Sequence, residues 1–250
     1  MLSIEKFNWS GLDAAIRGMR NPKNSWDLSD STDSEFGPED RKLAINLSRA
    51  GSDHAKYRRM IVVWADITAP LYWWKEFDTY KIGTVANSCS TMHKIHSKKF
   101  ELGDFSHEHL ITFNSICSEI PFENLVVTTI DDDLNVKTGI REGVPFTLIG
   151  DDSSAMPFSP YGIMREVIAM LNRCRELYLE TNDKKYWWQL IQLLPSSYNQ
   201  KRTVMLNYEV LGNIYHARRN HKLDEWHSFC DWIEMLPYSE LIIKDYHDKS

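Results

Sequence analysis

The sequence lacks several features that define common classes of protein. Its four cysteines form no C-x-x-C pair, which is typical of free thiols in a reducing compartment. No apolar run reaches the length of a signal peptide or a membrane span, so we expect a cytoplasmic protein with no membrane partner. The net charge of −6 argues against a nucleic acid polymer as partner, but allows a nucleotide in a local basic pocket.

The common catalytic and phosphate-binding fingerprints are missing as well. There is no G-x-S-x-G, no P-loop and no Rossmann glycine motif, so any dinucleotide must bind in another way. The pairs His93/His96 and His107/His109 lack an evident third ligand, and surface histidines are the commoner explanation. The run from Asp131 to Asp133 lacks the spacing of a calcium loop and fits a solvated turn. The sequence therefore predicts no metal site.

Aromatic residues are abundant, with nine Trp and eleven Tyr. They fit either a core and an oligomer interface rich in aromatics or a surface that stacks on a flat ring system. A length of 250 residues with 42% hydrophobic content predicts one domain over 1–250. Within it, residues 121–158 are expected to form an insertion or flap, because that region is rich in turn-forming residues.

Hydrophobic periodicity and capping residues predict most of the secondary structure. Pro38 and Gly51 bracket a helix, a strand covers 60–67, and a second helix carries 71–77. The chain is expected to be helical from Tyr161 onward, and residues 18–37 are expected to be loop-like. The further predicted helices run from Ser106 to Cys117, from Tyr161 onward, from the Asn182-Asp183 cap to Pro195, from Thr203 to about His221, and then through Met235.

Two separated stretches carry residues suited to ligand binding. In the first, the apolar strand leads through Trp73 and Trp74 to a run of small polar residues that begins at Asn87. A buried strand that feeds a polar, aromatic segment is a common support for a ligand site. The second stretch is the helix predicted from Thr203, which carries an asparagine and an arginine.

In that predicted helix, Asn207 and Arg218 are eleven residues apart, about three turns or 15 Å along the axis, and therefore share a face. An arginine on a mainly apolar stripe is costly to bury without partners. Two explanations stay open: a buried ion pair with Asp224 or Glu225, or a guanidinium that points toward a planar ring rich in acceptors.

Taken together, the two stretches resemble the flavin-dependent thymidylate synthase family. In the first, Ala69-Pro70 matches an Ala-Pro pair, and Thr79-Tyr80-Lys81 takes the place of an Arg-His-Arg triplet. The positions of Thr84, Asn87 and Ser90 match a Ser, an Asn and a second Ser, and His54 matches a histidine before the strand. The second stretch aligns without gaps through Leu194-Pro195, Asn207, Asn213 and Arg218.

The resemblance implies an α/β (α+β) fold with a mixed sheet flanked by long helices, assembled as a homotetramer with sites between subunits. It implies a flavoprotein methyltransferase of nucleotide biosynthesis that converts dUMP to dTMP. FAD donates hydride, methylenetetrahydrofolate supplies the carbon, and NADPH, the NADP-linked reductant, reduces the flavin again. Such cofactors carry the chemistry, while the protein supplies positioning and electrostatics.

The resemblance also implies roles for individual residues. Arg218 is the catalytic residue, because it would stabilise negative charge on the uracil ring. The substrate-binding residues are Asn87, Ser88, Ser90, Gln192 and Arg218. The cofactor-binding residues are His54, Thr79, Tyr80, Lys81, Asn207 and Asn213.

The sequence departs from the family where the nucleotide phosphate would bind. Met92 and Ile191 stand where the family has arginines. Each lost charge-assisted contact costs about 1.5–3 kcal/mol unless another cation replaces it, and Arg20, His93 and Lys94 are the candidates. Two other functions therefore stay open: action on another pyrimidine nucleotide, or a catalytically silent nucleotide-binding oligomer.

Overall fold

The computed structural model describes most of the chain and divides it into two compact units. One unit joins Met1–Ile95 to Pro195–Ser250, and the other is His96–Leu194. The expectation of one domain with an insertion or flap stays a prediction, and much of 121–158 lies outside the described part. The described residues are 2–32, 35–111, 125–130, 136–141 and 160–243.

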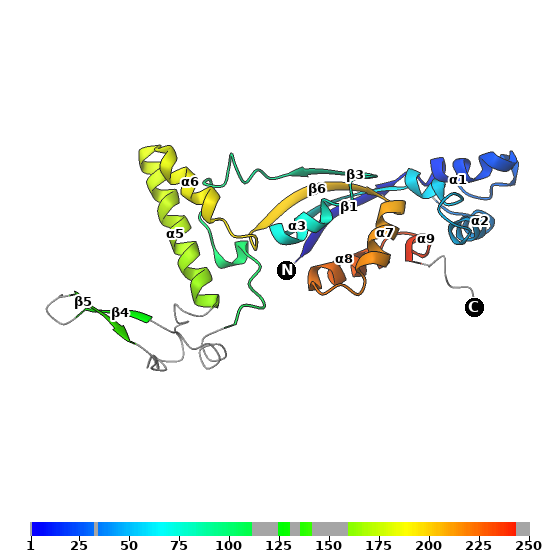
Figure 1. Cartoon of the computed structure of the whole chain (residues 1–250). Coiled ribbons are helices and arrows are strands. Elements are labelled where there is room, and N and C mark those ends of the chain that lie inside the picture. Colours follow the sequence, from blue (N-terminus) through cyan, green and yellow to red (C-terminus); the bar gives the residue numbers. More distant parts are fainter. Residues whose placement is uncertain (1, 33–34, 112–124, 131–135, 142–159, 244–250) are drawn as a thin grey trace. The chain divides into compact units, whose positions relative to one another are not determined.

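The first unit is built on a four-stranded sheet (Figure 1). Its strand order is β1-β2-β6-β3, and each pairing is antiparallel, where a mixed sheet was expected. The central strands β2 and β6 pair along their whole length, from Val62 opposite Asn207 to Pro70 opposite Asn199. The strands are β1 (Ser3–Ser10), β2 (Val62–Pro70), β3 (Thr84–Ser88) and β6 (Asn199–Asn207).

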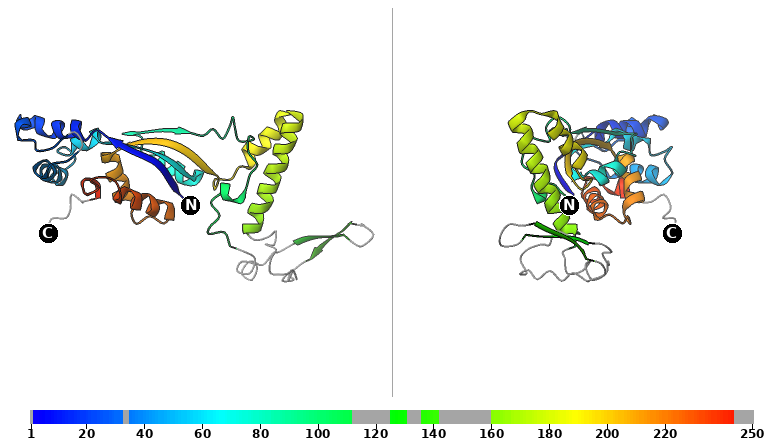
Figure 2. Two further views of the ribbon diagram at one scale, coloured as in Figure 1. Left: turned by 180° about the vertical axis from the view of Figure 1, so that it is seen from behind. Right: turned by 60° about the vertical axis from the view of Figure 1, so that its left-hand side comes forward.

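Side chains alternate between the two faces of this sheet, as the two-residue period of a strand requires. In β2, Val63, Ala65, Ile67 and Ala69 are buried, while Trp64 on the opposite face is 37% exposed. Helices α3, α7 and α8 lie on one side of the sheet in Figures 1 and 2. The unit's helices are α1 (Leu12–Arg20), α2 (Pro38–Arg49), α3 (Leu71–Phe77), α7 (Tyr208–Arg218), α8 (Asp224–Glu234) and α9 (Glu240–Ile243).

A cluster of aromatic rings joins α3 to α8. Trp73, Trp74 and Phe77 of α3 are buried, as are Trp226 and Phe229 of α8. The ring of Trp73 lies 4.7 Å from that of Trp226 and 5.1 Å from that of Phe77. Aromatic pairs at such distances stabilise a core beyond the area that they bury. Of the two explanations for the many aromatic residues, these five therefore support the core.

Several predicted elements are confirmed and others are wrong. Helices α2 and α3 begin and end close to the predicted residues. The helix predicted from Thr203 is wrong in its first turn, because residues 203–207 continue strand β6 and the helix begins at Tyr208. Helix α1 occupies part of the predicted loop. Residues 106–111 form no helix, and the rest of that prediction lies outside the described residues.

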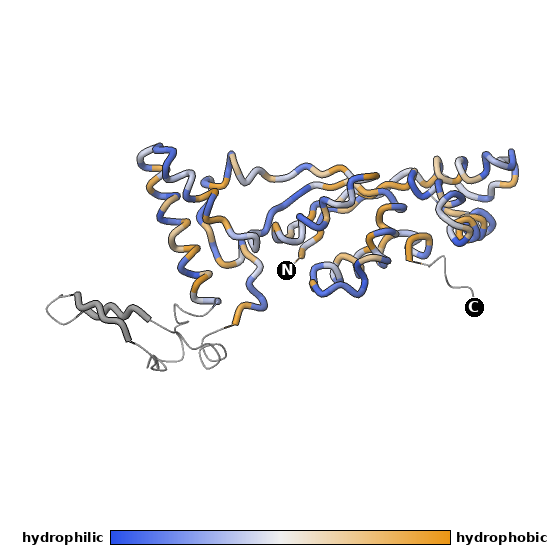
Figure 3. The backbone as a smooth tube through the Cα atoms, in the orientation of Figure 1, coloured by the Kyte–Doolittle hydropathy of each residue, from blue (hydrophilic) through white to orange (hydrophobic). Residues whose placement is uncertain are grey.

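The second unit contains two long helices and a hairpin. Asp183 caps α6 as predicted, since its Oδ1 accepts from the Lys185 N–H at 2.9 Å. Apolar residues recur among polar ones along α5 (Figure 3), in keeping with the predicted spacing of three and four residues. The elements are the 3₁₀ turn Leu102–Asp104, β4 (Leu125–Ile130), β5 (Val136–Arg141), α5 (Pro160–Thr181) and α6 (Lys184–Leu193). Within the described residues, no helix has the length and apolar character needed to cross a bilayer.

Candidate functional site

Arg218, at the end of α7, meets Tyr80, which follows α3. Its Nε donates to the Tyr80 hydroxyl at 2.9 Å, and its guanidinium carbon lies 4.9 Å from the centre of the Trp226 ring. The residue is partly exposed. The fold therefore brings together two predicted site residues that are 138 positions apart. A guanidinium between an aromatic face and a hydroxyl is well suited to hold a planar, acceptor-rich group.

Glu76 of α3 organises this cluster. Its Oε2 accepts from Arg218 Nη1 at 2.7 Å and from Trp226 Nε1 at 3.1 Å, and His221 Nε2 lies 3.4 Å away. Of the two open explanations for Arg218, an ion pair is present, but it is partly exposed rather than buried and its partner is Glu76 rather than Asp224 or Glu225. Among the described residues, Nη2 of Arg218 has no hydrogen-bond partner, so one edge of the guanidinium is left for a ligand.

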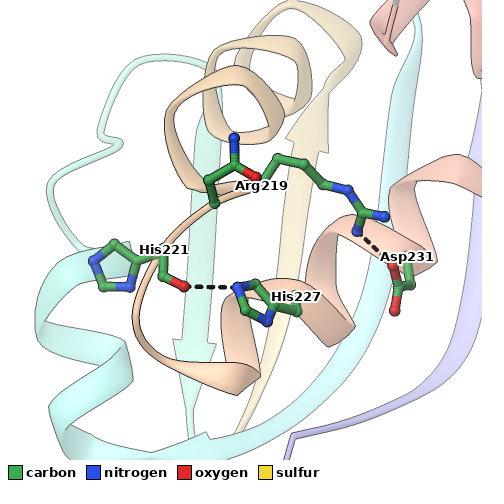
Figure 4. Close-up of a pocket in the computed structure, with 5 residues that line it drawn as sticks. Arg219, His221, His227 and Asp231 are labelled. Atoms are coloured by element: carbon green, nitrogen blue, oxygen red, sulfur yellow. Dashed lines mark hydrogen bonds and ion pairs between the residues drawn. The ribbon is translucent and has the colours of Figure 1, made fainter.

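A polar pocket adjoins this cluster at His221 (Figure 4). It has a volume of about 520 Å³ and lies where the loop after α7 meets α8. His227 Nε2 donates to the backbone carbonyl of His221 at 2.6 Å, and Arg219 pairs with Asp231 at 2.5 Å. The Leu223 N–H donates to His221 Nδ1 at 3.2 Å, which places the proton of neutral His221 on Nε2, toward Glu76.

Strand β3 carries two of the predicted substrate residues on opposite faces of the sheet. Asn87 lies opposite Thr203 on the open face, while Ser88 lies opposite Arg202 on the face that the helices cover. The expectation that Asn87 and Ser88 of one chain contact the nucleotide together is therefore in conflict with the strand's alternation. Ser90 follows β3, and its Oγ accepts from the backbone N–H groups of Met92 and His93.

Asn207 ends β6 and caps α7. Its Oδ1 accepts from the Val210 N–H at 2.9 Å, and its own N–H donates to the Gly83 carbonyl at 3.1 Å. A Cβ on Gly83 would lie 2.3 Å from Asn207 Nδ2, and Gly83 has a φ of 78°. Glycine is needed there for both reasons. The cap uses only one end of the carboxamide, so Nδ2 is left as a donor.

The Asn207→Ala variant is expected to lose about 1 kcal/mol of unfolding free energy, because the first turn of α7 loses its cap. Asn207→Ser is the matched control, since serine also caps helices but has no amide donor. Urea denaturation measures both. If the alanine and serine variants lost equal stability, the cap would not be the source of the effect.

The other predicted residues are dispersed over the two units. His54 lies exposed in the turn after α2, and Asn213 is exposed on α7. Thr79 uses its hydroxyl to bond the carbonyl of Glu76 at 2.7 Å, and Lys81 is exposed. Gln192 is exposed on α6 in the second unit. The cofactor and substrate roles of these residues stay predictions.

One of the three candidates to replace the phosphate arginines is wrong. Arg20 is only 5% exposed, and its Nε donates to Asp40 Oδ1 at 2.5 Å. A buried arginine held by a carboxylate cannot reach a ligand in solvent. His93 and Lys94 are exposed in the segment after β3.

Arg202 is a cation near β3 that sequence reasoning missed. It lies opposite Ser88, and its guanidinium carbon stacks 4.2 Å from the centre of the Trp74 ring. Its Nε donates to Gln200 Oε1 at 3.0 Å and its Nη1 to Asp78 at 2.7 Å. The register between β3 and β6 is the only signal that could have indicated Arg202. That register could not be predicted, because residues 203–207 of β6 were expected to be helical.

No side chains in the described ranges gather as a metal site of three or more His, Cys, Asp or Glu groups.

No protein-family model matches the sequence, and no curated protein matches it. The structure nevertheless has the α+β fold of the flavin-dependent thymidylate synthases, which confirms the predicted fold.

Two solved proteins illustrate the likeness. Thymidylate synthase X of Helicobacter pylori, solved with FAD and dUMP, is 16% identical at a TM-score of 0.59, with 96% of each chain covered. The UMP/dUMP methylase PolB of Streptomyces cacaoi, bound with 5-Br dUMP, is 14% identical at a TM-score of 0.53. There the match covers 96% of this chain and 92% of the other.

Proposed function

We propose that the chain binds a uracil nucleotide beside Arg218 and, with FAD, methylates it reductively, converting dUMP to dTMP. The hydrogen bond between Arg218 and Tyr80 carries the proposal, because it joins both motifs of the resemblance at one point. Proteins of this fold solved with FAD and dUMP, or with 5-Br dUMP, support the ligand class. Methylenetetrahydrofolate and NADPH are the proposed co-substrates.

Arg218 supplies the electrostatic part of this function. Its unpartnered Nη2 donates to a uracil oxygen, and the positive charge stabilises negative charge that develops on the ring. Glu76 and Tyr80 fix the guanidinium before the substrate arrives, so that little reorganisation is needed at the moment of reaction.

Asn207 offers a flavin one donor, because its Nδ2 has no hydrogen-bond partner among the described residues. The space beside Gly83 is taken up by this carboxamide, since a Cβ on Gly83 would lie 2.3 Å from Nδ2. Tyr80 and Asn207 are proposed to hold FAD with Lys81, Thr79, Asn213 and His54. When bound, FAD supplies the hydride chemistry, which the described side chains cannot.

For the nucleotide phosphate, we propose Arg202 with Ser88 and Ser90 in place of the missing arginines. Arg202 and Ser88 occupy paired positions on the same sheet face. Stacking on Trp74 keeps the guanidinium oriented, and its side chain is 14% exposed, so a phosphate could compete with Asp78 for it.

A catalytically silent nucleotide-binding oligomer is the second candidate, together with action on another pyrimidine nucleotide. The observation that favours the silent protein is the hydrogen bond from Arg218 Nη1 to Glu76. This bond takes up a donor of the arginine that should face the uracil ring. The homotetramer expected from the resemblance is part of both proposals, and light scattering of the purified protein measures its mass.

The purified protein is expected to be yellow or to take up added FAD, and FAD and dUMP are each expected to raise its melting temperature. A ligand at one hundred times its Kd adds about 2.7 kcal/mol of stability. Incubation with dUMP, methylenetetrahydrofolate and NADPH is expected to yield dTMP. Colourless protein that dUMP stabilises but FAD does not would support the silent binding protein. No response to either ligand would overturn both proposals.

A further inference from the structure

The second unit contains a basic cavity that the proposed function does not use. It has a volume of about 450 Å³ and lies between one face of α5 and the segment 99–102. Arg165, Ala169 and Arg173 follow one another at four-residue spacing, so they line a single helix face. Lys99 adds a third cation from the facing segment.

The positive charge of this cavity is largely unpaired. Arg165 and Lys99 have no hydrogen bond or ion pair with any described residue. Glu176 lies 3.5 Å from Arg173, but both side chains are at least half exposed, and such pairs contribute little. In a chain with a net charge of −6, three cations around one concave surface create a local positive potential that attracts anions.

The wall of the cavity is held rigidly. Asn172 of α5 clamps the backbone of Phe100, since its Oδ1 accepts from the Phe100 N–H at 2.8 Å and its Nδ2 donates to the Phe100 carbonyl at 2.9 Å. Arg175 Nε donates to the His96 carbonyl at 2.9 Å. Phe100 itself is buried. These contacts fix the segment that carries Lys99 against α5, which lowers the ordering cost of binding.

The rest of the lining is apolar or aromatic. Leu102 and Ile168 line the cavity with the cations, and Tyr161 lies one turn before Arg165 on α5. The volume is within the range of about 300–1,000 Å³ that is typical of small-molecule sites. Arginine side chains suit phosphate groups, whereas an apolar floor and a tyrosine suit a ring.

We propose that this cavity is a second anion site, which binds a small phosphate ester that carries an aromatic ring. The phosphate contacts Arg165, Arg173 and Lys99, and the ring lies on Ile168 beside Tyr161. The site lies wholly within the second unit and is independent of Arg218, so it does not rest on the proposed function.

Calorimetric titration of the full chain with phenyl phosphate tests this site, with inorganic phosphate and phenol as partial ligands. Phenyl phosphate is expected to bind more tightly than either partial ligand, and more weakly as salt is added. The Arg165→Gln/Arg173→Gln variant is expected to lose at least tenfold in affinity. Glu166→Gln on the same helix is the matched control, and it and Arg218→Ala are expected to keep the wild-type affinity.

Because Arg165 makes no hydrogen bond or ion pair with a described residue, Arg165→Gln alone serves if the double variant is unstable. Equal affinity in the Arg165 variant and the wild type would overturn the proposal, as would no binding to the wild type. A loss of affinity in Arg218→Ala but not in the Arg165 variant would place the ligand at the Arg218 site instead. Retained binding with no methylation activity would leave this proposal standing and count only against the proposed function.

Discussion

Replacing Arg218 with alanine is expected to lower the affinity for dUMP by about tenfold to one hundredfold, and turnover with it. The loss of a charge-assisted hydrogen bond costs about 1.5–3 kcal/mol, and the variant also leaves Glu76 without its cation. Calorimetric titration with dUMP measures the first effect, and the rate of dTMP formation measures the second.

Two control variants separate the role of the guanidinium from a general loss of charge. Arg219→Ala removes the neighbouring cation, which pairs with Asp231 and Glu234, and is expected to keep the affinity. Glu76→Gln keeps an amide oxygen as acceptor for Nη1 and removes only the charge, so it is expected to keep the affinity. If Arg218→Ala bound and turned over dUMP as the wild type does, the assignment of Arg218 would be wrong.

Replacing Asp40 with alanine is expected to lower the unfolding free energy by about 3–5 kcal/mol, the usual cost of leaving one partner of a buried ion pair unpaired. The Asp40 carboxylate is fully buried. It accepts from Arg20, from the hydroxyls of Ser29 and Ser31, and from two backbone N–H groups. Chemical denaturation measures the loss.

Asp13→Ala is the matched control, because it breaks the exposed pair between Asp13 and Arg17 of α1. Both side chains of that pair are more than half exposed, so the expected cost is at most about 1 kcal/mol. Equal losses in the two variants would mean that burial does not set the strength of the Asp40 pair.

Asp40 also predicts how stability depends on pH. Burial raises the pKa of Asp40, but the hydrogen bonds from Ser31, Ser29 and Arg20 and the charge of Arg20 outweigh it, and the pKa lies below its usual 3.8. The unfolded state therefore binds a proton first as the pH falls. This contribution is present above about pH 4 and is lost as the pH falls through the lower folded pKa. Asp40→Asn is expected to lack this part of the acid dependence.

Much of the fold followed from local patterns. Helix α2 could be predicted because Pro38 at its start and its apolar spacing lie within a dozen adjacent residues. Helix α6 could be predicted for the same reason, since its cap, Asp183, directly precedes it. The boundary between β6 and α7 was missed because Val204 and Leu206 fit either period over so short a run. Pairing with β2 on one side and β3 on the other decides for a strand.

The candidate site was predictable only in part. The resemblance indicated Arg218 and Tyr80, and the structure brings them within hydrogen-bond distance. It did not indicate Glu76 or Arg202, whose importance depends on partners in other elements. Arg20 appeared available in a polar loop, but Asp40 holds it in the interior.

By itself, the amino-acid order determined where helices α2, α3, α5 and α6 form and which residues carry cationic and amide groups. Caps and apolar periodicity act within a few turns, so adjacent residues are enough to set them. Tertiary structure alone decided which of those groups are committed to ion pairs and which are left for a ligand. That choice depends on contacts such as Glu76 with Arg218, which form only when distant segments pack together.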